Sequence, residues 1–214
     1  MSGFTLKIIA MLTMVVDHIG AVFFPEMLWM RIIGRISFPL FAFAAAEGAR
    51  YTHDRQKYLT RLLLWGVIAE VPFDLMCHQS PFFPLSQNVC FTLAAGVACI
   101  YLLEKASGKN LAIVFAILLT TFLIATDYSF VGVLSVVIIH RYASQGKAVK
   151  GVACACLLLT MMFTTQVFSF LALIPLLFYN GKPGKRLKYL FYIFYPLHMF
   201  IIWAVWAVMN TTVK

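Results

Sequence analysis

TLKIIAMLTMVVDHIG, residues 5–20, has the apolar composition of a membrane-spanning helix, yet it contains a lysine and an adjacent aspartate–histidine pair. Asp17 and His18 interrupt the apolar run, and no small-residue cleavage site follows at a suitable distance. We therefore interpret the segment as a retained first helix and not as a secretory signal. Each charged group in hydrocarbon costs at least roughly 2.5–3.5 kcal/mol, so we expect Lys7, Asp17 and His18 to have a function that offsets this cost.

The whole chain has the composition of an integral membrane protein, with 62% hydrophobic residues, 12% charged residues and 20 Phe in 214 positions. Apolar runs of about 15–22 residues recur along it, and this is the length of transmembrane helices. They lack the polar–apolar alternation of barrel strands. The sequence predicts an all-α, polytopic integral membrane helical bundle in a single domain, 1–214, with about nine transmembrane helices and eight or ten as the alternatives. The expected spans are 4–24, 30–50, 58–76, 88–104, 110–126, 129–142, 148–164, 166–180 and 188–209.

Basic residues lie mainly on one side of this predicted topology. The loops after the second, fourth, sixth and eighth spans return to the side of the N-terminus, and they carry most of the 17 Lys and Arg. Because cytoplasmic loops are enriched in these residues, we expect a multi-pass protein of the bacterial inner membrane with a cytoplasmic N-terminus. The net charge of +9 thus reflects topology, and nucleic-acid binding is not implied. The basic residues expected on the cytoplasmic side are Lys7, Arg50, Arg55, Lys57, Arg61, Lys105, Lys109, Arg141, Lys147, Lys150, Lys182, Lys185, Arg186 and Lys188; those on the other side are Arg31, Arg35 and Lys214.

Acidic residues are few, and most of the eight lie within the expected helices or at their outward ends. When the polar groups are mapped onto the topology, six helices contribute to one layer in the outward half of the membrane. Chance would scatter such groups between the two leaflets, so a polar cavity open to the outside is the economical interpretation. The layer contains Asp17, His18, Arg31, Arg35, Glu70, Asp74, Asn88, Thr92, Asp127, Tyr128 and His198.

These residues also have structural interpretations. A lone intramembrane histidine is more often a packing residue than a catalyst, and Arg35 and Asp74 are candidates for a structural ion pair. Cys77 and Cys90 flank an outward loop and are placed to form a disulfide if that side is oxidising. One spacing favours function: Lys7 and His18 share a helix face and are about 16 Å apart along the axis. A cation at the cytoplasmic mouth and an imidazole in the outer half indicate a cavity that one long ligand traverses.

The same residues carry a resemblance to known families. Lys7 followed after ten residues by His18 resembles the Arg/Lys-x10-His pattern in the first helix of acyltransferase-3-type membrane acyltransferases. More closely, the chain resembles the TraX family, which includes the enzyme that acetylates the N-terminus of conjugative pilin. The stretches that match are "LKIIAMLTMVVDHIG", "RIIGRISFPLFAFAAAEG", "YLTRLLLWGVIAEVPFDL", "QNVCFTLAAG", "DYSFVGVL", "LIPLLFYNGKPGK" and "YLFYIFYPLHMFIIW".

This resemblance implies an integral membrane enzyme that passes an acetyl group from cytoplasmic acetyl-CoA, without a metal, to an acceptor across the membrane. The acceptor stays open: a protein N-terminus, a sugar, or another amine or hydroxyl. We expect His18 to act as general base, because an imidazole titrates near neutrality. The candidate catalytic residues are His18, Asp74, Asp127 and His198; the candidate donor- or substrate-binding residues are Lys7, Arg35, Asn88, Lys182 and Lys185; the candidate structural residues are Asp17, Arg31, Glu47 and Glu70.

Two details of these roles depend on helix geometry. Asp17 lies about 100° round the helix from His18, so we expect it to bond Arg31 or Arg35 and not to orient His18. Asp74 or Asp127 is the expected orienting group, and a covalent acetyl-His18 intermediate stays open. The alternative function is a small-molecule or proton-coupled transporter, since buried acids, histidines and Pro-broken helices suit one as well. Release of CoA from acetyl-CoA would discriminate the two.

Overall fold

Polar residues set the starts of several helices. Ser2, Asp54, Asn88 and Ser107 each precede a helix, and each side chain accepts a hydrogen bond from a backbone N–H in its first turn. Such caps satisfy N–H groups that have no partner within the helix. The helices begin where this local chemistry favours a start, and apolar runs extend them.

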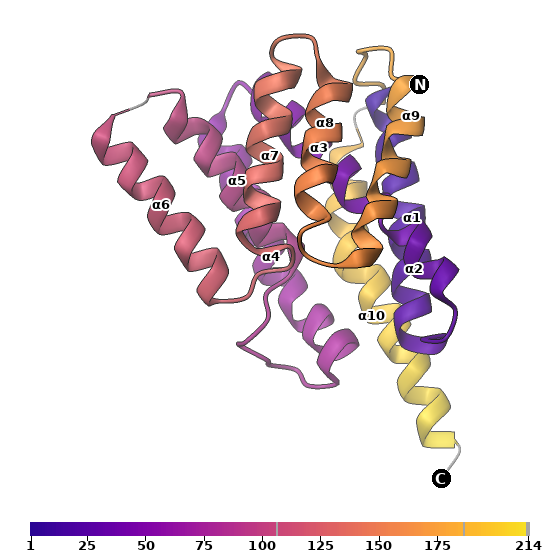
Figure 1. Cartoon of the computed structure of the whole chain (residues 1–214). Coiled ribbons are helices and arrows are strands. Elements are labelled where there is room, and N and C mark those ends of the chain that lie inside the picture. The colour runs from indigo at the N-terminus through magenta and orange to yellow at the C-terminus, as the bar shows by residue number, and fades with distance from the viewer. Residues whose placement is uncertain (106, 186, 213–214) are drawn as a thin grey trace.

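The computed structural model describes residues 1–105, 107–185 and 187–212, so Arg186 and Lys214 of the predicted charge pattern lie outside it. Within these ranges the chain is helical and forms no strand (Figure 1). The elements are α1 (Gly3–Phe23), α2 (Leu28–Gly34), α3 (Ser37–Tyr51), α4 (Arg55–His78), α5 (Val89–Leu103), α6 (Gly108–Leu123), α7 (Ser129–Ala143), α8 (Ala148–Leu159), the 3₁₀ helix η1 (Thr164–Ala172), α9 (Leu173–Leu177) and α10 (Lys188–Thr212).

The all-helical prediction is confirmed, and each expected span coincides with one helix or one broken pair. The second span is broken between α2 and α3, because Pro39 has no N–H to continue the hydrogen-bond ladder back to Arg35. The eighth is η1 followed by α9. Among the described residues, three helical segments are long and apolar enough to cross a membrane, namely Gly3–Phe23, Leu28–Tyr51 and Tyr189–Thr211. The number of transmembrane helices therefore stays a prediction.

The ends of the bundle follow the predicted alternation. Figure 1 shows the N-terminus at the same end as the connections that follow α5, α7 and α9, while the α1–α2, α6–α7 and α8–η1 turns lie at the opposite end. The N-terminal segment is fixed to the connection before α10, because Gly3 N donates to Lys182 O at 2.8 Å and Phe4 N donates to Pro183 O at 2.9 Å. Residues far apart in sequence thus close one end of the molecule together.

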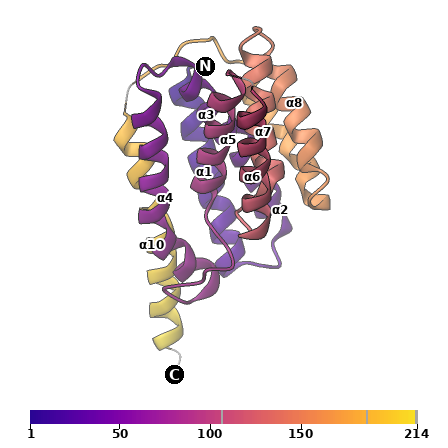
Figure 2. The same cartoon turned by 90° about the vertical axis from the view of Figure 1, so that its left-hand side faces the viewer.

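The buried apolar side chains of the described residues form two cores. The larger core lies among α3, α5, α7 and α8, where Val97, Val136 and Ile139 are fully buried. The smaller core includes Met14 of α1, Phe73 of α4 and Met199 of α10. Figure 2 shows α4 and α10 side by side along one edge of the bundle, and the two helices pack against each other. Helix α1 packs against α10 as well as against α2 and α3.

Candidate active site

Asp17 joins α1 to α2 through two arginines. Its carboxylate accepts from Arg35 Nη2 at 2.9 Å and forms an ion pair with Arg31 Nη1 at 3.1 Å. Arg31 also donates to the Asp17 backbone carbonyl at 3.0 Å. Gly34 makes this approach feasible, since a Cβ there would lie 2.1 Å from Asp17 Oδ1. The expectation that Asp17 bonds Arg31 or Arg35 is confirmed for both arginines.

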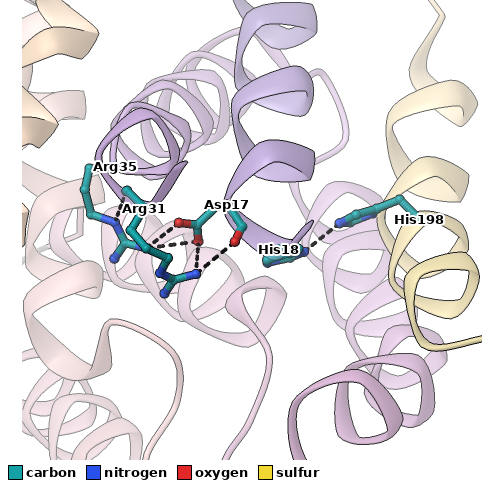
Figure 3. Close-up of polar contacts among 5 residues, drawn as sticks. All are labelled: Asp17, His18, Arg31, Arg35 and His198. Atoms are coloured by element: carbon teal, nitrogen blue, oxygen red, sulfur yellow. Dashed lines mark hydrogen bonds and ion pairs between the residues drawn. The ribbon is translucent and has the colours of Figure 1, made fainter. Parts of the chain in front are cut away.

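His18 points to the opposite side of α1, toward α10 (Figure 3). Its Nδ1 lies 2.9 Å from Nε2 of His198. The two rings are within 6° of parallel, with centroids 5.0 Å apart. The structure thus brings together two of the predicted catalytic residues from helices that are distant in sequence.

Hydrogen bonding fixes the tautomer of both rings. Nδ1 of His198 lies 2.8 Å from the Phe194 carbonyl, which only accepts, so Nδ1 carries a proton. In a neutral His198 ring Nε2 is then an acceptor, and Nδ1 of His18 must donate to it. Nε2 of His18 keeps a free lone pair, because the hydrogen bond that the ring makes within residues 1–105, 107–185 and 187–212 is through Nδ1. This is the state that a general base requires.

A cavity of about 600 Å³ lies among α1, α3, α4, α5 and α10. Lys7, His53 and Arg61 line it toward the end of the bundle that carries the N-terminus, and its walls are mostly aromatic and aliphatic. Trp65 and Tyr192, two of the lining residues, stack on each other with ring centroids 5.8 Å apart. A cavity with cationic groups at one end and apolar walls suits an elongated ligand with an anionic head.

The deep end of the cavity approaches the histidine pair. Met14 and Phe194 line it there, and each lies four residues before a histidine on the same helix. Four residues correspond to about 6 Å along a helix, so the cavity ends one turn from both imidazoles. Lys7, Met14 and His18 follow one face of α1, as the spacing predicted.

The cationic end of the cavity differs from the predicted donor site. Lys7 lines it, with its Nζ 5.1 Å from the centroid of the Phe191 ring. Lys182 and Lys185 are exposed and are not among the lining residues. Arg61 does line the cavity. Its buried Nε has no hydrogen-bond partner in the described part of the chain. Sequence reasoning assigned Arg61 to topology alone, although Tyr58, Arg61 and Trp65 recur at helical spacing on one face of α4.

Asn88 and Asp74 have partners of their own. The Asn88 amide donates to Gly66 O at 2.8 Å and to the Glu70 carboxylate, while its oxygen accepts from Cys90 N at 3.0 Å. Its donors are thus already engaged at the start of α5. Asp74 Oδ2 accepts from Phe83 N at 2.7 Å.

The suggested Arg35–Asp74 ion pair is wrong, because Arg35 pairs with Asp17. Asp74 Oδ1 is buried without a partner among the described residues. Cys77 and Cys90, considered as a disulfide, are free thiols.

Asp127 lies in the turn between α6 and α7. Its backbone carbonyl accepts from Thr92 Oγ1, and its N–H donates to Gln87 O at 2.8 Å. Burial raises the pKa of the Asp127 carboxyl to about 6, and the nearby Arg35 opposes this rise. No hydrogen bond in the described ranges joins Asp74 or Asp127 to His18; His198 occupies the position expected of the orienting carboxylate.

The remaining predicted residue, Glu47, lies away from this pair. Tyr179 Oη donates to its carboxylate at 3.3 Å, and Arg50 lies 3.7 Å away. This cluster joins α3 to the end of α9. No three His, Cys, Asp or Glu side chains of the described residues are grouped so that they could hold a metal ion.

A family model and curated relatives match most of the length of the chain. A family model described as TraX protein matches residues 2–206. The chain is 30% identical over 211 residues to a probable fimbrial assembly protein FimC, serogroup H1, of Dichelobacter nodosus, which covers 86% of each chain. It is 32% identical over 157 residues to Protein TraX of Escherichia coli, which covers 72% of this chain and 61% of that relative. No solved structure matches.

Proposed function

The chain belongs to the TraX family of membrane proteins, and on this premise we propose that it is an acetyl-CoA-dependent membrane acetyltransferase. It moves an acetyl group from acetyl-CoA on the cytoplasmic side to an amine or hydroxyl acceptor in the outward half of the membrane. The observation that carries this proposal is the cavity, which begins at Lys7 and Arg61 and ends one turn from the His18–His198 pair.

The charge and shape of the cavity support the choice of donor. Acetyl-CoA carries phosphate charges at one end and a thioester at the other, joined by a flexible arm. Lys7 and Arg61 provide cationic groups for the phosphates, with His53 lining the same end, while the aromatic walls enclose the arm. The thioester then reaches the deep end beside Met14 and Phe194.

The histidine pair supplies the proton transfers that acyl transfer needs. Nε2 of His18 removes a proton from the acceptor amine or hydroxyl as the acceptor atom bonds to the thioester carbon. The carbon–sulfur bond then breaks, and the proton on Nε2 passes to the leaving thiolate. The Nδ1–H bond to His198 holds the ring in the tautomer that leaves Nε2 free. Arg35 and Asn88, predicted from the sequence to bind donor or substrate, already have partners within the protein, so that role stays a prediction.

The names of two relatives suggest where to look for the acceptor. One relative is a probable fimbrial assembly protein, and the other is Protein TraX. A pilin N-terminus is an amine of the class that His18 could deprotonate. A sugar hydroxyl is the competing acceptor, and acetylation assays with each substrate distinguish them.

Purified protein in proteoliposomes provides the test of function. The parent should release free CoA thiol from acetyl-CoA when an acceptor amine is supplied, and His18→Gln should not. His140→Gln is the matched control, because His140 lies on α7 outside the cavity and the histidine pair. A transporter would release no CoA; equal release by the parent and by folded His18→Gln would overturn the catalytic proposal.

The proposed orientation has its own test. The N-terminus and the connection before α10 lie in the cytoplasm, where the donor is available, and the connection 79–88 lies outside. A periplasmic reporter should be active when inserted within 79–88 and inactive within 181–185. An inactive outer fusion in a stable protein would contradict this topology.

A further inference from the structure

The deep end of the cavity is closed by side chains of two facing helices. Met14 of α1 is 6% exposed, and Phe194 of α10 packs against the same buried cluster. Both line the cavity, and both lie one turn before a histidine of the pair. A ligand that enters from the cationic end therefore meets these side chains before it can pass the imidazoles.

Other side chains pack against the residues that close the cavity. The Phe194 ring stacks on the His198 ring, with centroids 4.6 Å apart and an angle of 9° between the planes. Tyr195, the neighbouring lining residue, is 8% exposed, and Met199 behind it is fully buried. Packed groups of this kind resist the insertion of additional atoms.

We propose that Met14 and Phe194 form the floor that restricts the transferred group to acetyl. The inference rests on the proposed function and names its donor specificity. The thioester carbonyl must lie as close to His18 as the floor allows, and an acetyl group places only a methyl beyond that carbonyl. A longer acyl chain meets the floor first and holds the carbonyl back toward Lys7. A misplacement of about 1 Å can cost about 10²-fold in rate.

Substitution of the floor residues should change the choice of donor. Met14→Ala and Phe194→Ala deepen the cavity, so the ratio of kcat/KM for butyryl-CoA to that for acetyl-CoA should rise by at least about 10-fold, the effect typical of a methylene in an apolar pocket. Phe191→Ala is the matched control. Phe191 lines the same cavity nearer to Lys7, so its truncation should leave the ratio unchanged whatever it does to the overall rate.

A binding measurement keeps the inference separate from the proposed function. S-ethyl-CoA and S-butyl-CoA are thioethers that cannot transfer an acyl group, and their thermal stabilisation of the protein reports fit alone. The parent should be stabilised more by S-ethyl-CoA, and Met14→Ala should reduce or reverse that preference. If the parent releases no CoA from acetyl-CoA, the proposed function fails while this test still applies. Two outcomes would overturn the inference that Met14 and Phe194 limit the length of the acyl group. One is equal stabilisation of the parent by both thioethers, and the other is an unchanged preference in folded Met14→Ala and folded Phe194→Ala.

Discussion

Nδ1 of His18 lies 2.9 Å from Nε2 of His198, and the two rings are within 6° of parallel. The partner that orients His18 is thus a second imidazole, itself fixed by the Phe194 carbonyl. A neutral partner orients the ring without adding a negative charge to an apolar region.

The bond from His18 to His198 predicts different outcomes for two substitutions at His198. The amide oxygen of Gln can accept from Nδ1 of His18, whereas Leu cannot, so His198→Gln should retain more activity than His198→Leu. Removal of one oxyanion-hole hydrogen bond costs about 10²–10³-fold in rate, and we expect His198→Leu to lower the rate by a similar order. The measurement is kcat for CoA release, with circular dichroism to confirm folding. Equal rates for folded Gln and Leu variants would show that His198 does not position His18.

The Asp17–Arg35 pair should show strong coupling in stability. Asp17 and Arg35 are each 9% exposed. Asp17→Ala leaves both arginines without their carboxylate, a loss of about 3–5 kcal/mol for a buried pair, whereas Arg35→Ala leaves Asp17 paired with Arg31 and should cost less. Asp17→Ala and Arg35→Ala should each lower the unfolding free energy in detergent, and the double variant should lose less than the sum.

A double-mutant cycle of Asp74→Ala and Arg35→Ala provides the control. Asp74 bonds Phe83 and not Arg35, so the losses of Asp74→Ala and Arg35→Ala should add. Additive losses for Asp17 and Arg35, or coupled losses for Asp74 and Arg35, would contradict the geometry described above.

Cationic residues of the cavity should control donor binding. Acetyl-CoA stabilises the folded state by mass action if it binds there, so it should raise the melting temperature of the parent. Lys7→Gln and Arg61→Gln should reduce this rise, because both residues line the cavity. The Lys182→Gln/Lys185→Gln double variant removes two charges outside it and tests the site expected from sequence. A rise lost only in that variant would place the phosphates at the connection before α10.

Asp127 should make stability depend on pH. Burial raises the pKa of its carboxyl from 3.8 to about 6 in the folded protein, so the folded state holds this proton more tightly than the unfolded chain. The contribution is fully present below about pH 4 and is lost as pH rises through about 6, with a cost of roughly 3 kcal/mol at most. Asp127→Asn should therefore melt above the parent at pH 7.5, and the difference should vanish near pH 4. A constant difference across that range would contradict the shift.

The apolar runs predicted the helices well, because burial in a membrane requires runs of this length. The face shared by Lys7 and His18 also predicted a long cavity from one helix alone. Contacts between side chains on different helices were harder to predict from the sequence. Asp17 and its arginines are close in sequence and were anticipated, whereas the partner of His18 was expected to be a carboxylate. Only the packing of α10 against α1 brings His198 to that position. Arg61 was missed because a basic residue near a loop equally indicates topology.

The adjacent residues Asp17 and His18 acquire their partners at very different times. Arg35 follows Asp17 by 18 positions, but His198 follows His18 by 180. At a synthesis rate of about 5–20 residues per second, the arginine emerges within about 1–4 s and the second histidine after about 9–36 s. The costly charge is therefore neutralised in the first helical hairpin of the nascent chain. The imidazole pair proposed to be catalytic forms last, so an unfinished chain would reside in the membrane before that pair is assembled.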